Sequence, residues 1–136
     1  MATILAHIHI KRGMEEQFEA IARSLYATSH ESEKGLRRYE YWRGEEEGLY
    51  YTLLSFDDFL SFIAHQTSDH HETASPQIGA VVAGIRLEWV DPIRGASPLV
   101  VTEAQQPPAD ADALTAAYAR RFAATIAEWW GPLRAG

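Results

Sequence analysis

The order of strand-like and helix-like patterns in the first two thirds of the chain most narrows what it can fold into. Segment 3–10, TILAHIHI, alternates with a period of two residues, which is typical of a strand with one side on a core. Segment 14–32 repeats its apolar residues every three to four positions, which predicts an amphipathic helix that ends near Gly35. Segments 36–44 and 49–56 alternate again on either side of EEEG, and therefore predict an antiparallel hairpin.

A second helix and a fourth strand complete the pattern. The Asp pair at 57–58 is suited to cap a helix that runs into the motif HQTSDHH, residues 65–71. The Ser-Pro pair at 75–76 predicts the start of a separate short helix that stops by Gly84. Residues 85–90, IRLEWV, alternate and predict the last strand. The order β-α-β-β-α-β predicts an α+β fold of the ferredoxin-like split type with a small extra helix.

The remaining residues predict an extension of this fold. A chain of 136 residues with 46% hydrophobic side chains has the size of one core, so we expect a ferredoxin-like domain over 1–95 and an extension over 96–136. Within the extension, 97–104 could form a short extra strand, and 105–112 is a Pro-rich linker. Residues 114–130 carry apolar side chains at helical spacing and predict a second long amphipathic helix.

Charge and cysteine content exclude several classes of function. Twelve Lys and Arg stand against nineteen Asp and Glu, and a net charge of −7 repels both phosphate backbones and anionic membranes. We therefore expect no nucleic-acid and no membrane partner. The absence of cysteine excludes disulfides and thiolate chemistry, and suits a reducing compartment. The start MATILAHIHI has no basic n-region, and no apolar run approaches the roughly 20 residues that span a bilayer, so we expect a cytoplasmic protein.

The predicted sheet has apolar and aromatic residues on both faces, although its helices can cover only one. A twofold partner that brings its own sheet would cover the other face and close a barrel with a cavity. The sequence therefore predicts a homodimeric α+β barrel. The alternative is that the helix predicted over 114–130 covers this face within the same chain.

The motif HQTSDHH holds three of the six histidines and has three interpretations. As a metal site, it would use His65 and Asp69, which lie four residues apart and would share one face of a helix. His7 and His9, two apart on one strand face, could complete the site. A closed site needs four ligands, and the chain has no HExxH signature, so we expect no metal.

The other two interpretations concern single histidines. His70 and His71 could simply end a helix, where an imidazole can bond the last carbonyls, and for His71 this is the favoured interpretation. His65 follows Ala64 at the border of the apolar helix face, so it is predicted to point inward. An inward histidine can be a catalytic base or a hydrogen-bonded structural residue, and the sequence leaves both open.

Two stretches, HIKRGMEEQFEAIARSL and EKGLRRYEYWRGEEEGLYYTLLSFDDFLSFIAHQTSDHHETA, resemble the antibiotic biosynthesis monooxygenase family. The matching positions are Gly13, Gly35, Phe56, Asp57, His65, Ser68, His70 and His71. The resemblance covers residues 1–95 and implies a dimeric α+β barrel. It also implies oxidation of quinols or polycyclic phenols by O2, often without metal or flavin, while a related branch degrades haem.

The chain departs from two branches of that family. The resemblance to the antibiotic-tailoring members would place Asn, Trp, Tyr and His where the chain has Thr52, Phe56, Phe62 and Trp42, and it keeps only the tyrosine at Tyr41. The haem-degrading members have an Asn on the first strand and a Trp followed by a His near the end of the second helix. This chain has Ala6 or His7, His65 and Ser75 there. The resemblance is thus nearest to the simpler quinol-type members.

Quinol oxidation requires at least a base, because a phenol has a pKa of about 10 and its anion gives an electron to O2 far more readily. A histidine side chain, with an ordinary pKa of about 6.5, can accept that proton, and such help raises the rate by roughly 100- to 10,000-fold.

We therefore predict His65 as catalytic base, no cofactor, and a small aromatic substrate with O2. The alternative is a dimeric barrel that binds a small aromatic ligand without turnover. Predicted substrate-binding residues are His7, His9, Tyr41, Trp42, Tyr51, Phe56, Phe62, His70 and Trp89.

Overall fold

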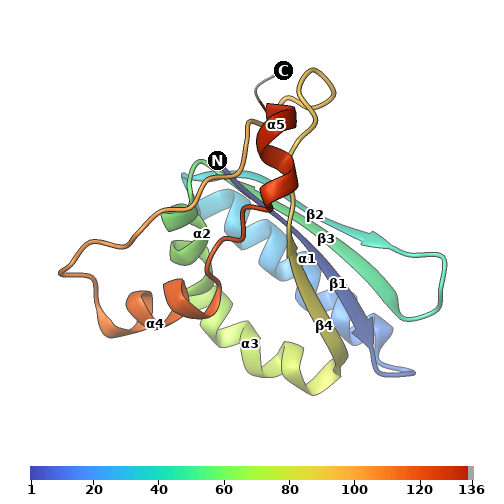
Figure 1. Cartoon of the computed structure of the whole chain (residues 1–136). Helices are drawn as coiled ribbons and strands as arrows, with labels where there is room; N and C mark the ends of the chain where they lie inside the picture. Colours follow the sequence, from blue (N-terminus) through green and yellow to red (C-terminus); the bar gives the residue numbers. More distant parts are fainter. Residues whose placement is uncertain (135–136) are drawn as a thin grey trace.

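A computed structural model describes residues 1–134. Its sheet has four antiparallel strands in the order β2-β3-β1-β4. The strands are β1 (Ala2–Ile10), β2 (Leu36–Arg43), β3 (Leu49–Phe56) and β4 (Val82–Trp89). One side of the sheet is covered by the helices α1 (Glu15–Ser32), α2 (Phe59–Gln66) and α3 (Asp69–Val81) (Figure 1). The predicted ferredoxin-like α+β fold is confirmed.

The strand register decides which residues share a face of the sheet. Ala6 on β1 lies opposite Thr52 on β3 and Leu87 on β4, and Tyr41 on β2 also lies opposite Thr52. Because side chains alternate along a strand, these residues point toward the helices, on what we call the helix-covered face. The intervening residues form the open face: Leu5, His7, His9, Leu49, Tyr51, Leu53, Glu40, Trp42, Arg86 and Glu88.

The core lies between the helix-covered face and the helices. Phe18 and Leu25 of α1 and Phe62 and Ile63 of α2 are at most 3% exposed, and Phe56 at the end of β3 is 1% exposed. The apolar residues of α1 recur at the helical spacing that predicts a helix over 14–32. Helix α1 starts one residue later, at Glu15. Burial of such side chains stabilises a fold by about 25 cal/mol for each Å² of apolar surface.

The helix boundaries around HQTSDHH differ from the prediction. Helix α2 ends at Gln66, and Ser68 caps a new helix, because its Oγ accepts a hydrogen bond from the backbone N–H of His71. The predicted helix start at 75–76 is wrong: α3 begins at Asp69 and passes through Pro76, which has no backbone N–H to donate within the helix. The predicted stop by Gly84 is confirmed, since α3 ends at Val81 and β4 begins at Val82.

The C-terminal extension is less helical than predicted. Helix α4 (Ala113–Arg121) is followed by irregular chain, a 3-10 turn η1 (Glu128–Trp130) and the short α5 (Gly131–Arg134). The predicted helix over 114–130 is broken after Arg121, where the carbonyl of Ala123 accepts the indole N–H of Trp89 instead of continuing the helix. No strand forms at 97–104, although that segment bonds to the backbone of Met1.

Helix α4 packs against α2, on the same side of the sheet as the other helices (Figure 1). The idea that a helix over 114–130 covers the open face is therefore wrong, and Trp42 on that face stays 60% exposed. Through residue 134, the structure contains no helix with the length and hydropathy that a membrane crossing needs.

Candidate functional site

A cavity of about 390 Å³ lies between the helix-covered face and the helices. Its size is at the lower end of the roughly 300–1,000 Å³ of small-molecule pockets. Most of its wall is apolar or aromatic, and the wall opens at the edge strand β4, where Ile85 and Leu87 are 55% and 40% exposed. The lining side chains that carry polar atoms come from Tyr39, Tyr41, Thr52, His65, Gln66, His71, Ser75, Tyr118 and Arg121.

Three side-chain atoms in this wall are buried without a hydrogen-bond partner: Thr52 Oγ1, His65 Nε2 and His71 Nδ1. A buried polar atom without a partner costs roughly 1–3 kcal/mol, so native proteins have few of them. In residues 1–134 all of the unpartnered buried side-chain atoms belong to residues that line this one cavity. The arrangement is what a cavity that binds a polar ligand group requires.

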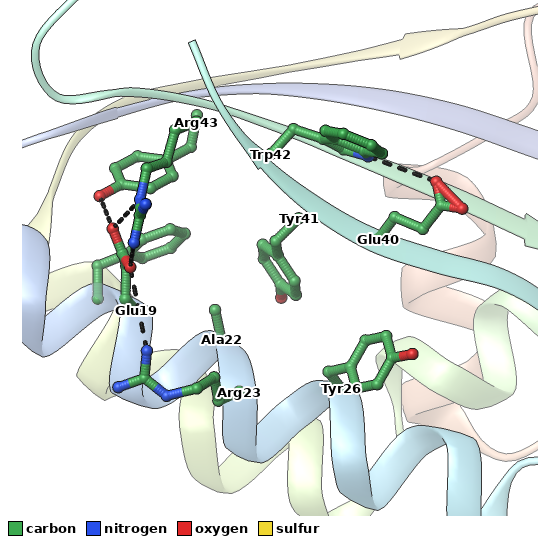
Figure 2. A pocket seen from close by; sticks show the side chains of 10 residues that line it. Glu19, Ala22, Arg23, Tyr26, Glu40, Tyr41, Trp42 and Arg43 are labelled. Atoms are coloured by element: carbon green, nitrogen blue, oxygen red, sulfur yellow. Dashed lines mark hydrogen bonds and ion pairs between the residues drawn. The ribbon is translucent and has the colours of Figure 1, made fainter.

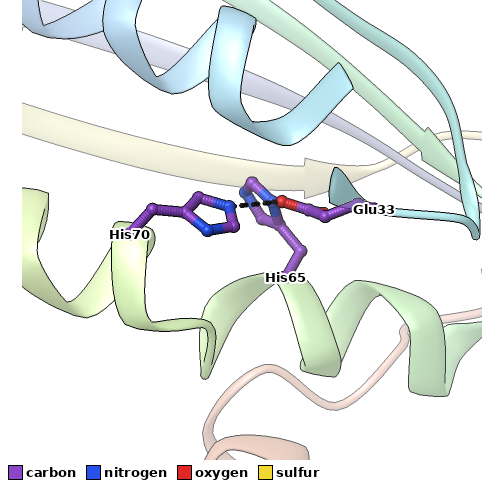
Figure 3. Close-up of side chains that lie close together, drawn as sticks. All are labelled: Glu33, His65 and His70. Atoms are coloured by element: carbon purple, nitrogen blue, oxygen red, sulfur yellow. Dashed lines mark hydrogen bonds and ion pairs between the residues drawn. The ribbon is translucent and has the colours of Figure 1, made fainter. Parts of the chain in front are cut away.

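His65 is the best positioned of these groups. It lies near the end of α2, is 1% exposed, and contacts the rings of Phe56, Tyr39 and His71 at centroid distances of 5.3, 5.1 and 4.9 Å. Its Nδ1 lies 2.9 Å from both carboxylate oxygens of Glu33 (Figure 3). The predicted inward orientation of His65 is thus confirmed, while its role stays a prediction.

Glu33 is held at the end of α1, where its backbone N–H bonds to the carbonyl of Ser29 at 2.9 Å. Its carboxylate also lies 2.6 Å from Nε2 of His70, which comes from α3 (Figure 3). Burial raises the pKa of Glu33, but the hydrogen bonds and the electrostatic interaction with His65, together with the hydrogen bond from His70, outweigh it and bring the pKa to about 2. The carboxylate is therefore ionised at neutral pH.

An ionised carboxylate can only accept hydrogen bonds, so Nδ1 of His65 must donate to it. In neutral His65 the proton then lies on Nδ1, and Nε2 keeps a free lone pair. That lone pair belongs to the unpartnered atom in the cavity wall. Glu33 thus fixes both the ring orientation and the tautomer in which His65 can accept a proton from a ligand.

Three further side chains bring polar atoms to the cavity wall: His71, Tyr39 and Tyr41. Burial, with the nearby His65 and His70, lowers the pKa of His71 to about 4, so its imidazole is neutral at pH 7. The hydroxyls of Tyr39 and Tyr41 lie 2.6 Å apart. Burial raises the pKa of Tyr39 well above its ordinary value and that of Tyr41 to about 12. Both tyrosines therefore stay protonated.

A second hollow, a groove of about 760 Å³, lies outside the cavity between α1 and the edge strand β2. Figure 2 shows Tyr41 pointing toward α1, and Trp42 on the other side of the strand. The groove is bordered by Glu19, whose pKa is lowered to about 2 by hydrogen bonds from Arg43 and Tyr50. Tyr41 lines both hollows, so it is part of the wall between the groove and the cavity.

The model of the family described as antibiotic biosynthesis monooxygenase matches residues 1–77, more than half of the 136 residues. The chain belongs to the antibiotic biosynthesis monooxygenase family. In this family member, Glu33, His65 and His70 all lie inside the matched segment, whereas α4 lies outside it. No curated protein matches the chain.

Solved structures show the same fold. A protein from Pseudomonas aeruginosa is 23% identical with a TM-score of 0.61, covering 65% of this chain and 90% of its own. A Caulobacter crescentus protein named for the antibiotic biosynthesis monooxygenases is 23% identical with a TM-score of 0.65, covering 68% and 90%. A Mycobacterium tuberculosis protein is 15% identical with a TM-score of 0.64, covering 71% and 98%. At these identities the likeness concerns the fold alone.

The structure divides the predicted site residues of this family member between the two faces of the sheet. Tyr41, Phe62 and His65 line the cavity. Phe56, His70 and Trp89 lie on the same side without lining it: Phe56 and Trp89 pack on Phe62, and His70 bonds to Glu33. The remaining predicted site residues lie on the open face and cannot reach His65 in the same chain: His7, His9, Trp42 and Tyr51.

The metal site considered from the sequence is wrong, because the structure keeps its residues apart. His65 and Asp69 lie in different helices, and His7 and His9 lie on the opposite side of the sheet from His65. Among the described residues, the group compact enough to hold a metal ion is Glu33, His65 and His70, with ligand atoms within 4.8 Å of one another. Two imidazoles and a carboxylate suit Zn²⁺, which would have to displace the protons that now join these groups.

Sequence reasoning missed Glu33 and the role of His71. His71 is in the first turn of α3, so the interpretation that it ends a helix is wrong. Glu33 gave no signal of its own, because it is one of several charged residues after a predicted helix. The signal that could have found it is the predicted fold itself, because the end of α1 lies beside the start of α3, where Ser29 and Glu33 both contact His70.

Proposed function

We propose that this chain is a monooxygenase that oxidises a small phenolic or quinol substrate with O2, with His65 as general base. The observation that carries the proposal is the unpartnered Nε2 of His65, buried in the cavity wall while Glu33 holds Nδ1 at 2.9 Å. The family supports a small-molecule site of this kind, since the chain belongs to the antibiotic biosynthesis monooxygenases.

The chemistry needs few protein groups. His65 Nε2 takes the proton of the substrate hydroxyl, and the resulting anion transfers an electron to O2. The oxygen joins a ring carbon as a peroxide, and cleavage of its O–O bond leaves one oxygen atom on the ring. The other leaves as water, with the proton held by His65 and the hydrogen of that ring carbon. A phenol and O2 thus become a quinone and water.

The surroundings of His65 support this role. The Glu33 carboxylate stabilises the imidazolium that forms, in the way that a carboxylate orients a catalytic histidine in other enzymes. The aromatic walls from Tyr41 and Phe62 suit a flat ring. Thr52 Oγ1, also unpartnered, can donate a hydrogen bond to a second oxygen on the substrate.

The test is O2 uptake with a panel of hydroquinones and naphthols. His65→Ala should reduce turnover by roughly 100- to 10,000-fold while the circular dichroism spectrum stays unchanged. His30→Ala removes an exposed histidine on α1 and is the matched control, with turnover expected to stay at the wild-type value. Equal turnover in wild type and His65→Ala would exclude His65 as the base.

Two arms distinguish the alternatives. A chelator should leave turnover unchanged if His65 acts as a base. Loss of turnover with the chelator would show that Glu33, His65 and His70 bind a metal that the reaction needs. The alternative function, a barrel that binds an aromatic ligand without turnover, would give saturable binding of the same compounds with no O2 uptake in wild type.

A further inference from the structure

Helix α4 forms the outer wall of the cavity. Tyr118, Arg121 and Phe122 at its C-terminal end line the cavity together with residues of the sheet and of α2. The Tyr118 hydroxyl donates a hydrogen bond of 2.6 Å to Glu72 on α3. The rings of Phe122 and Phe62 pack together, with their centroids 6.0 Å apart. Because α4 lies beyond residues 1–77, the part of the cavity that it builds is additional to the segment that defines the family.

The charge of the cavity wall is carried by one residue. No Asp or Glu lines the cavity in the described part of the chain, and Arg121 is its sole Arg or Lys. The Arg121 guanidinium lies 4.9 Å from the centroid of the Phe122 ring. Within residues 1–134 no carboxylate pairs with it, although the chain carries a net charge of −7. An unpaired cation at the mouth of an otherwise apolar cavity is suited to attract an anion.

We propose that Arg121 binds a carboxylate on the substrate, so that the cavity takes a hydroxylated aromatic acid. This inference rests on the proposed function for the hydroxyl end, where His65 lies 1% exposed, while Arg121 is exposed at the mouth. A planar guanidinium matches a carboxylate with two parallel hydrogen bonds. A phosphate would call for further donors, and the described lining offers no second Arg or Lys.

The volume and the distribution of polar groups fit this class of compound. A cavity of about 390 Å³ accommodates one or two fused rings, and its wall offers polar atoms both on buried side chains, such as His65, and on the exposed Arg121. The rest of the wall is largely apolar, with side chains such as Ile8, Leu54 and Phe62. The expected ligand is therefore largely apolar, with a hydroxyl group for His65 and a carboxylate for Arg121.

The experiment compares two ligands that differ only in charge. A hydroxynaphthoate and the corresponding hydroxynaphthamide share ring and hydroxyl, and isothermal titration calorimetry gives the affinity of each for the full chain. At a partly exposed site the acid should bind about fivefold more tightly than the amide. This preference should shrink when salt is raised from about 0.05 M to about 0.5 M, because salt screens exposed charges.

Arg121→Gln should remove the preference for the acid and leave the affinity for the amide unchanged. Arg120→Gln is the matched control: it removes the same charge one residue earlier on α4, from an exposed side chain that does not line the cavity. It should keep the preference. Equal affinity of wild type for acid and amide, or a preference that survives in Arg121→Gln, would overturn the inference.

Failure of this inference is distinguishable from failure of the proposed function. Binding of the acid that depends on Arg121, without O2 uptake, would support the carboxylate site and refute only the oxidation. Turnover that depends on His65, with a preference for the acid that Arg121→Gln leaves intact, would refute only the carboxylate site.

Discussion

The two faces of the sheet both carry histidines and aromatic rings, but only one of them builds a cavity. On the helix-covered face, His65 is 1% exposed and Glu33 fixes its ring. On the open face, His7 lies 3.0 Å from Glu88 and against the ring of Tyr51 in a half-exposed setting. The residue types are similar, and the difference is burial. A histidine becomes a candidate base when a partner holds one nitrogen and the fold keeps water from the other.

The two faces also differ in which of their groups lack a partner: polar atoms on the helix-covered face, and apolar side chains on the open face. The helix-covered face has unpartnered polar atoms in the wall of a cavity, which points to a small ligand. The open face carries the partly exposed apolar side chains of Leu5, Leu49, Tyr51 and Leu53, and Trp42 is 60% exposed there. Such a surface suits another protein surface rather than a small molecule. We propose that a second copy of this chain covers it.

The largest effect should come from truncating the core of the helix-covered face. Phe56 is 1% exposed and packs on Phe62 and His65, so Phe56→Ala should lower the free energy of unfolding by about 3–5 kcal/mol. His9→Ala on the open face, where the side chain is exposed, should change it by less than about 0.5 kcal/mol. Urea unfolding at one protein concentration measures both. Similar losses in the two variants would mean that the faces do not differ in burial.

The second effect is the change of folding stability with pH that His71 causes. The folded-state pKa of His71 is about 4, against an ordinary value of 6.5, so below pH 6.5 the unfolded chain binds the proton more readily. Stability from this residue is complete above pH 6.5 and is lost as pH falls toward 4, by about 3 kcal/mol at most. Thermal unfolding of wild type and His71→Leu between these pH values measures it. The variant should show a flatter dependence on pH, and parallel curves would show that His71 is not buried as a neutral imidazole.

The smallest of the three effects concerns the open face. If two open faces pack together, Tyr51→Asp, near the centre of that face, should raise the dimer dissociation constant by about 30-fold, equivalent to about 2 kcal/mol. Tyr26→Asp on α1, where the side chain is 46% exposed, is the control and should leave the constant unchanged. Sedimentation gives both values. A folded wild-type monomer at micromolar concentration would contradict the proposed homodimer.

The sequence predicts the order of the elements well because each strand and helix of residues 1–95 carries its own periodicity. Alternation in 3–10 is enough to define β1, and the spacing from Phe18 to Leu25 is enough to define α1. Helix ends are less predictable, since Ser68 and the Ser-Pro pair at 75–76 are both acceptable caps. The structure uses Ser68, and the helix that begins there buries Ala74, which lies before the Ser-Pro pair.

The candidate site is less predictable, because its partners come together only in three dimensions. His65 could be inferred from its place on α2, but Glu33 is 32 residues away in sequence. Arg121 lies in a segment predicted as one long helix, and its place in the cavity wall depends on the packing of α4 against α2, which the sequence does not show. Local patterns say which face of an element is apolar, and they do not say which distant carboxylate or cation will meet it.

The place of Glu33 at the end of α1 has a consequence for insertions and deletions. Helix α1 has 18 residues, and each residue of an α-helix adds about 1.5 Å of length and turns the chain by about 100°. One residue gained or lost within α1 would therefore swing the carboxylate away from His65, even if every apolar contact could be rebuilt. Related chains that keep this carboxylate–histidine pair should accept length changes in the EEEG hairpin, and keep the length of the first helix constant.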